Sequence, residues 1–362
     1  MALDQISPFA AFLASFSDTA WPAWVLLIIA AAVYWSLLVV PQIALLSYMD
    51  RKLGADVQMR IGPNRVGPYG IIQPVADFLK LFFQEELSPK TQERALFRWG
   101  PLAAVVCVVW AVGSIPMADH WVLSSPESGL ILVVCALTLS HLCLFWAGYS
   151  VESAWSALSS FRMLASAALY LVPIAMSLIP PVLISGSVNL FEIMASQGGY
   201  PWRWNAFHDP GAALSCLVLF ASLQFWQGRL PMDFARADGE IAGGSLVEYS
   251  GLRKGIVSSL QHLGLFLSCA LLVTVYFGGG AVPFDLESLG RAANLVQWTF
   301  FTIKVFATAW VLIWIRWSLP RMRIDQAIRL SWKILLPAGI AGALLSAFWA
   351  VVTGGRGLGD FL

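Results

Sequence analysis

The sequence predicts an all-α membrane protein with about eight transmembrane helices and one amphipathic interfacial helix, built as a single domain over residues 1–362. Hydrophobic residues make up 58% of the chain and charged residues only 12%, which is too apolar for a water-soluble globule. The mean hydropathy is +0.72. The apolar residues gather in eight stretches of about twenty residues, the length an α-helix needs to cross a bilayer.

The expected spans are separated by loops of very unequal charge. If the spans alternate in direction, 18 of the 22 lysines and arginines fall on one side, in the loops 47–98, 150–162, 227–255 and 316–333. The positive-inside rule makes this side cytoplasmic and places both termini on the opposite side. The spans themselves are expected at 24–46, 99–117, 129–149, 163–184, 211–226, 256–277, 295–315 and 334–352.

Prolines and cysteines restrict what the spans can do. Pro41 and Pro173 each free a backbone carbonyl that lipid cannot satisfy, so their helices are expected to face other protein. All five cysteines lie in apolar spans without a C-x-x-C pair, which predicts neither disulfides nor an iron–sulfur cluster, and histidines are too scattered for a metal site.

The first cytoplasmic loop concentrates glycine, proline and charge. Between Arg60 and Pro68 the sequence IGPNRVG excludes a regular helix and predicts a fixed series of turns, which would hold Arg60 and Arg65 on a stiff loop. From Ile71 to Phe83 apolar residues recur at helical spacing, with a narrow polar stripe on the other side. The stripe consists of Gln73, Asp77, Lys80 and Gln84.

Two interpretations of this amphipathic helix are possible. It could lie in the lipid headgroup layer with a solvated polar face, or its stripe could face protein or a polar ligand. A lipid-binding helix carries mostly Lys and Arg, whereas this stripe mixes an acid, a base and two amides. The composition of the stripe favours the second interpretation.

Three stretches resemble one protein family. They are the R-x-G-P-N-R-V-G-P-x-G loop at Arg60 with the following Q-P-x-A-D-x-x-K-L, then Glu248-Tyr-Ser-Gly251, and the segment from Arg316 to Gln326. Together they resemble the H subunit of bacterial NADH:quinone oxidoreductase, respiratory complex I. The resemblance covers most of the chain and is identified on long, specific motifs.

The resemblance implies a membrane subunit that forms the quinone-access channel and joins the peripheral arm to the membrane arm. Its partners would be peripheral subunits carrying flavin and iron–sulfur clusters, other membrane subunits including antiporter-like ones, and the bilayer, with no nucleic acid. Quinone would be a substrate, and this chain would hold no flavin, cluster or metal. The location would be the bacterial inner membrane, with periplasmic termini. The channel residues would be Arg60, Arg65, Gln73, Asp77 and Lys80.

The resemblance also implies a proton path through acids that line a polar funnel from the quinone cavity. The matching residues are Asp50, Asp233, Asp238, Glu240, Glu248 and Lys304. Two positions depart from the family: Leu171 and Arg236 stand where it has acids. Arg236 would pair with a neighbouring acid and favour its ionised form, so the proton route is either moved or weakened.

Three further groups lie inside apolar spans. Lys304 is about ten residues from either end of its span, so we expect it to face protein and to pair with an acid. His141 and His262 are single histidines, for which hydrogen bonding in the core is the expected role.

Three alternatives remain open from the sequence. The equivalent subunit of a hydrogenase-type complex would share the E-Y-S-G stretch but is not expected to keep the whole G-P-N-R-V-G loop. A solute transporter would be expected to show paired repeats, which are absent from the sequence. A structural anchor with a weakened proton path is compatible with every motif.

Overall fold

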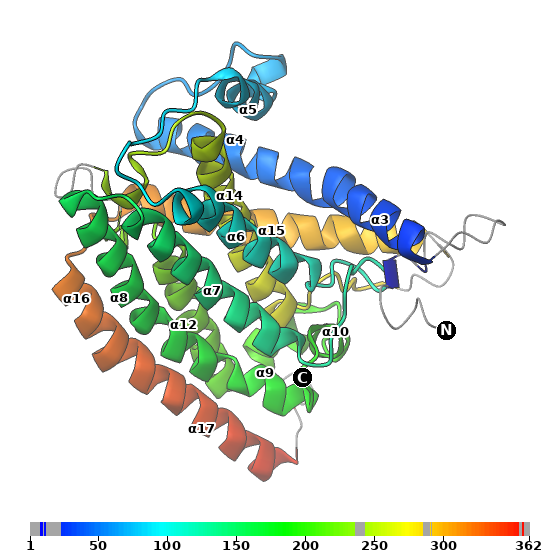
Figure 1. Cartoon of the computed structure of the whole chain (residues 1–362). Helices are drawn as coiled ribbons and strands as arrows, with labels where there is room; N and C mark the ends of the chain where they lie inside the picture. Colours follow the sequence, from blue (N-terminus) through cyan, green and yellow to red (C-terminus); the bar gives the residue numbers. More distant parts are fainter. Residues whose placement is uncertain are drawn as a thin grey trace.

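The computed structural model describes residues 8, 9, 11, 23–235, 243–284, 290, 292–354 and 357, and these residues form a helical bundle (Figure 1). No strand occurs in these ranges, in agreement with the predicted all-α class. The long helices are α3 Ala23–Val33, α4 Val40–Val57, α6 Arg94–Gly113, α7 Gly129–Tyr149, α8 Ala154–Ser177, α12 Pro210–Gln227, α14 Gly251–Tyr276, α15 Ala293–Ser318 and α17 Leu336–Thr353.

Shorter helices lie between these or cap their ends. They are the short π-helices η1 Tyr34–Val39 and η6 Ser331–Leu335, the 3₁₀-helices η2 Pro68–Gly70, η3 Pro201–Arg203 and η4 Gly244–Leu246, and the α-helices α5 Gln73–Phe83, α9 Ile179–Ser185, α10 Leu190–Ala195, α11 Asn205–His208 and α16 Ile324–Leu330.

Seven helices of the described chain are long and apolar enough to cross a membrane. The expected span 211–226 forms α12, which falls outside these seven because its 18 residues include glutamines and serines. Twelve of its residues are buried, and it packs against α8, α14 and α17. A helix shielded in this way can cross a bilayer with polar side chains, since its partners, and not lipid, surround them.

The prolines explain where the helices are irregular. The π-helix η1 is followed by Pro41 at the start of α4, and the π-helix η6 is followed by Pro337 at the start of α17. Proline supplies no backbone N–H, so the hydrogen-bond ladder one turn earlier opens into a wider turn. Pro180 and Pro181 likewise open the separate helix α9 after α8 ends.

The core centres on α14, which packs against α4, α5, α6, α12 and α15. Over an apolar stretch of 18 residues taken from each helix, 72% of the stretch is buried in α14, but only 28% in α15 and 22% in the last span, 324–353. The weakly buried helices lie at the outside of the bundle, with α3 and α15 on one side and α17 on the other (Figure 1). Their exposed apolar faces are the ones available to lipid or to other membrane subunits.

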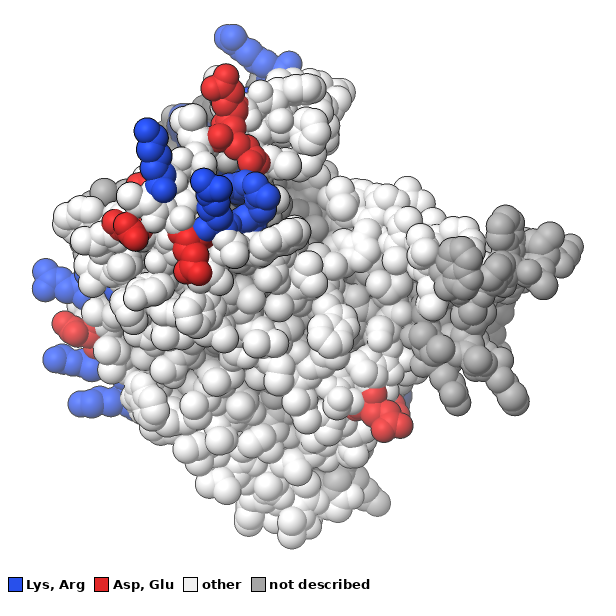
Figure 2. All heavy atoms as spheres, in the orientation of Figure 1, with Lys and Arg blue, Asp and Glu red and all other residues white. Residues whose placement is uncertain are grey.

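Charge is confined largely to one end of the bundle. On the face shown in Figure 2 most Lys, Arg, Asp and Glu side chains gather at the end that carries α5 and α16. The beginning of α3 and the end of α17 lie at the other end (Figure 1). The helices also extend further toward the charged end than hydropathy predicts: the first runs to Val57 and the last begins at Ile324.

Candidate functional site

A buried carboxylate lies near the charged end of the first span. Asp50, on α4, is 6% exposed and accepts hydrogen bonds from Arg229 Nη1 at 3.3 Å and from Arg316 Nη1. Arg229 itself is 5% exposed, and its Nη2 donates to the carbonyl of Gln261 on α14 at 2.9 Å. Through these two guanidinium groups, the Asp50 carboxylate on α4 links α14, α15 and the segment that follows α12. We call Asp50, Arg229 and Arg316 the ion triad.

A tryptophan completes the surroundings of the ion triad. Trp317 Nε1 lies 3.4 Å from the second carboxylate oxygen of Asp50, and the Arg316 guanidinium lies 5.2 Å from the Trp317 ring. The indole can come this close because Gly54 follows Asp50 by one helical turn. A Cβ on Gly54 would lie 2.6 Å from the indole ring.

The loop that carries Arg60 and Arg65 is folded into turns, as predicted. Its last residue Gly70 has a φ of +80°, and a Cβ there would lie 2.4 Å from the backbone of Pro63. Tyr48 Oη on α4 donates to the carbonyl of Tyr69 at 2.9 Å and attaches the loop to the bundle. Both arginines are exposed, and Arg60 Nε donates to Gln58 Oε1 at 2.8 Å.

The polar stripe of α5 faces protein in part. Gln73 Nε2 donates to Asp77 Oδ1 at 3.0 Å, and the other oxygen of Asp77 pairs with Arg51, the residue after Asp50. Lys80 is exposed. The acid of the stripe therefore pairs with a residue adjacent to the ion triad on α4, a placement that the sequence alone could not give.

The apolar face of α5 is open. No residue of α5 is buried, although the helix contacts α4 and α14. It stands off the end of the bundle, at the top of Figure 1. Its exposed apolar residues, together with those just before it, are Tyr69, Ile71, Ile72, Val75, Phe78, Leu79, Phe82 and Phe83.

The E-Y-S-G stretch, residues 248–251, contacts α6, α7 and the segment after α5 at the charged end of the bundle. Tyr249 is buried, stacks on Phe97 with ring centroids 4.3 Å apart, and its hydroxyl is within hydrogen-bond distance of the carbonyls of Phe97 and Ala147. Burial raises the pKa of the Tyr249 hydroxyl well above its ordinary value. Ser250 Oγ exchanges hydrogen bonds with the backbone N–H and C=O of Leu87.

Asp233 and Glu248 of the predicted proton path lie in the described chain. Asp233 is half-buried, four residues after Arg229, and Glu248 is exposed at the charged end. Asp238, Glu240 and the replacing residue Arg236 lie outside the described residues.

Lys304 lies far from the ion triad. Its Nζ donates to the carbonyls of Phe277 and Gly279, both at 2.9 Å, just past the end of α14. It also lies 4.8 Å from the Trp204 ring. Lys304 faces protein as expected, but its partners in the described chain are carbonyls and an indole, and the expected acid is not among them. Twelve residues of α15, about 18 Å of helix, separate it from Arg316.

His141, which is buried, and His262, which is half-buried, each lie within hydrogen-bond distance of a carbonyl of their own helix. His141 Nδ1 lies 3.4 Å from Leu137 O, and His262 Nδ1 lies 3.1 Å from Ser258 O, each four residues earlier. Within the described ranges, no group of three or more His, Cys, Asp and Glu side chains could hold a metal ion.

Comparison with known proteins identifies the family. Residues 29–347 match the sequence model of the family described as NADH dehydrogenase. The chain is 33% identical over 334 residues to the H subunit of the NADH-quinone oxidoreductase of Rubrobacter xylanophilus, covering 92% of this chain and 96% of that protein. It is 32% identical to the corresponding protein of Salinibacter ruber, over 87% of this chain and 93% of that protein. It is also 33% identical to the H subunit of the F(420)H(2) dehydrogenase of Methanosarcina barkeri, over 87% of this chain and 89% of that protein.

Proposed function

Because the chain belongs to the NADH dehydrogenase family, with the H subunits of NADH-quinone oxidoreductases among its relatives, we propose that it forms the quinone-access passage of a proton-translocating NADH:quinone oxidoreductase. It would act as a non-redox subunit at the junction of the two arms. Electrons would come from peripheral subunits carrying flavin and iron–sulfur clusters, and antiporter-like subunits would share the membrane arm. We place the charged end in the bacterial cytoplasm and the termini in the periplasm, from the distribution of basic residues.

The observation that carries the proposal is the position of α5. Its exposed apolar face lies beside the stiff Arg60 loop, and its acid Asp77 pairs with Arg51, next to the ion triad. A membrane quinone has a polar ring on a long apolar tail, so its site needs an apolar entrance that leads to polar groups. The α5 face supplies such an entrance, and the stripe of Gln73 and Asp77 supplies hydrogen-bonding groups for the ring.

The chemistry also requires protons. Reduction of a quinone by two electrons takes up two protons, and negative charge that develops on the ring needs donors nearby. Arg60, Arg65 and Lys80 are exposed cations at the same end of the bundle, where they can stabilise that charge. Asp50, Asp233 and Glu248 would belong to the route by which protons reach and leave this end.

The test separates quinone access from electron supply. Arg60→Ala and Asp77→Ala should each depress quinone reduction by the purified complex while leaving the reduction of a soluble acceptor by the peripheral arm unchanged. Lys90→Ala is the matched control, because Lys90 is also an exposed cation of the same loop but lies outside the α5 surface. Equal loss of both activities would instead assign these residues to assembly.

The electron donor is a separate question. The relative from Methanosarcina barkeri is named as part of an F(420)H(2) dehydrogenase, so H subunits of this sequence similarity occur in complexes named for different donors. Reduction of quinone by the purified complex with NADH, reduced deazaflavin or hydrogen offered in turn distinguishes these donors.

A further inference from the structure

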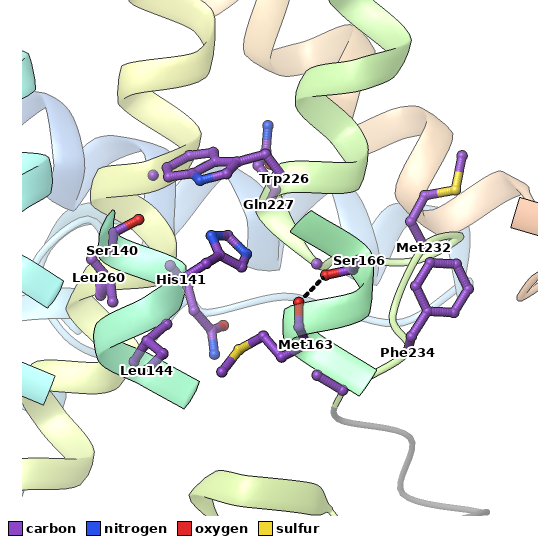
Figure 3. Close-up of a pocket in the computed structure, with 14 residues that line it drawn as sticks. Ser140, His141, Leu144, Met163, Ser166, Trp226, Gln227, Met232, Phe234 and Leu260 are labelled. Atoms are coloured by element: carbon purple, nitrogen blue, oxygen red, sulfur yellow. Dashed lines mark hydrogen bonds between the residues drawn. The ribbon is translucent and has the colours of Figure 1, made fainter. Parts of the chain in front are cut away.

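A small cavity lies where α7, α8, α12 and α14 meet, beside the ion triad: Gly228, the residue before Arg229, and Gln261, whose carbonyl accepts from Arg229, both line it. Its volume is about 50 Å³, and Figure 3 shows His141 at its centre, between Trp226 and Met163. Because one water molecule needs about 10–15 Å³ of such space, the cavity has room for about three to five water molecules.

The lining carries one amide without partners in the described part of the chain. Gln227, at the end of α12, is 9% exposed, and neither its Nε2 nor its Oε1 has a hydrogen-bond partner among the described residues. A buried amide without partners is destabilising, so such groups in native proteins are normally bonded to ordered water. Ser140 and Ser166 add two buried hydroxyls whose oxygens can still accept after donating to Leu137 O and Met163 O.

His141 is the titratable side chain among the fourteen residues that line this cavity. It is 8% exposed, its ring packs 5.2 Å from Tyr170 and 5.8 Å from Trp226, and its Nδ1 lies near the carbonyl of Leu137. When Nδ1 donates to that carbonyl, Nε2 of the neutral ring is an acceptor. An imidazole next to water can take a proton at one nitrogen and return it to a different water.

The histidine in this cavity packs against Tyr170 of α8. Tyr170 is followed on α8 by Leu171, where the family resemblance leads us to expect an acid. Among the described residues that line the cavity, the titratable one is His141 on the neighbouring helix α7, with its ring against Tyr170. An ionisable side chain inside a membrane span is a candidate for proton transfer, and this one shares a largely apolar cavity with the unpartnered amide of Gln227.

We propose that this cavity holds a cluster of water molecules bound by Gln227 and that His141 carries protons through it. The inference rests on the proposed function, since it supplies a step of that proton route. The step changes only N–H and O–H bonds: Nε2 of the imidazole accepts a proton from a protonated water, which becomes neutral, and then gives that proton to another water, with no electron transferred. Gln227 positions the water and does not titrate.

The experiment uses the purified complex in proteoliposomes with NADH and a short-chain quinone. His141→Leu and His141→Gln should each slow proton translocation by at least about tenfold, a threshold set below the roughly hundredfold that a positioned proton-transfer group contributes at the low end. Met163→Leu, which alters the same cavity without removing a polar group, is the control. His141→Gln is decisive because glutamine retains hydrogen bonding but cannot carry charge: near-normal translocation by this variant, or a loss smaller than tenfold, overturns the proposal.

Two further readouts keep the result unambiguous. Reduction of a soluble acceptor by the variants reports that the complex has assembled, and His141→Gln carries the test if His141→Leu does not assemble. A density map of the wild-type complex at about 2 Å should show water within hydrogen-bond distance of the Gln227 amide, whereas a dry cavity overturns the site. If the wild-type complex itself neither reduces quinone nor moves protons, the proposed function fails, whatever the variants do.

Discussion

Replacing the buried acid of the ion triad is the sharpest test of the structure. Asp50→Asn keeps the shape of the side chain but removes the charge that faces Arg229 and Arg316. Arg229 is 5% exposed, so its guanidinium would be left buried without its carboxylate. Removal of one partner from a buried ion pair costs about 3–5 kcal/mol, and we expect a loss of that size in the free energy of unfolding.

The measurement is equilibrium unfolding of the protein in mixed micelles with increasing sodium dodecyl sulfate. Asp56→Asn is the matched control, because Asp56 is an exposed acid on the same helix and its change should stay within about 0.5 kcal/mol.

The double variant Asp50→Asn with Arg316→Gln should recover part of the loss, since it removes a stranded charge together with its partner. A change below about 1 kcal/mol in Asp50→Asn, equal to the control, would mean that the triad is solvated and would refute the buried arrangement.

Three further predictions follow from local contacts. Gly54→Ala places a Cβ 2.6 Å from the Trp317 indole, so Trp317 must move, and oxidative footprinting read on the peptide that contains Trp317 should report greater exposure; unchanged oxidation of Trp317 would contradict the packing. Tyr249→Phe keeps the stack on Phe97 but loses the hydroxyl, and should destabilise the protein by about 1 kcal/mol in the same unfolding assay, whereas no loss would mean that the hydroxyl bonds only to water. At Asp209 burial raises the pKa of the carboxyl, but hydrogen bonds from His208, Ala212 N–H and Ser346 outweigh it and hold the pKa below its ordinary 3.8. The ionised Asp209 carboxylate therefore stabilises the protein fully at pH values above its ordinary pKa of 3.8, and this stabilisation is lost as the pH falls through the lowered pKa. The thermal midpoint of Asp209→Asn should accordingly lie furthest below that of the wild type at pH 7, and the difference should shrink below about pH 4.

Local sequence patterns predicted much of the architecture. Apolar stretches of membrane length became helices, and the glycines and prolines between Arg60 and Gly70 became turns, because both depend on neighbouring residues. The mixed stripe of α5 predicted a side that faces protein or a polar ligand; Asp77 pairs with Arg51, whereas Lys80 and Gln84 are exposed. The polar span α12 was predicted as well, although its burial by other helices could not be deduced from its own composition.

Contacts between distant segments were beyond such patterns. Arg229 and Arg316 lie 179 and 266 residues after Asp50, and no local spacing relates them. Lys304 was expected beside an acid, but the carbonyls at the end of α14 that it reaches depend on where that helix stops. The cavity around His141 results from how four helices pack, and a single histidine in an apolar stretch gives no sign of it.

The quinone passage can be tested by covalent labelling. The purified complex would be illuminated with a quinone that carries a photoreactive azide on its ring, and the labelled peptides of every subunit identified. We predict label on this chain within residues 60–83, suppressed by excess unmodified quinone and reduced in Asp77→Ala but not in Lys90→Ala. Label confined to other subunits, or insensitive to competing quinone, would contradict the assignment of the α5 surface to quinone access.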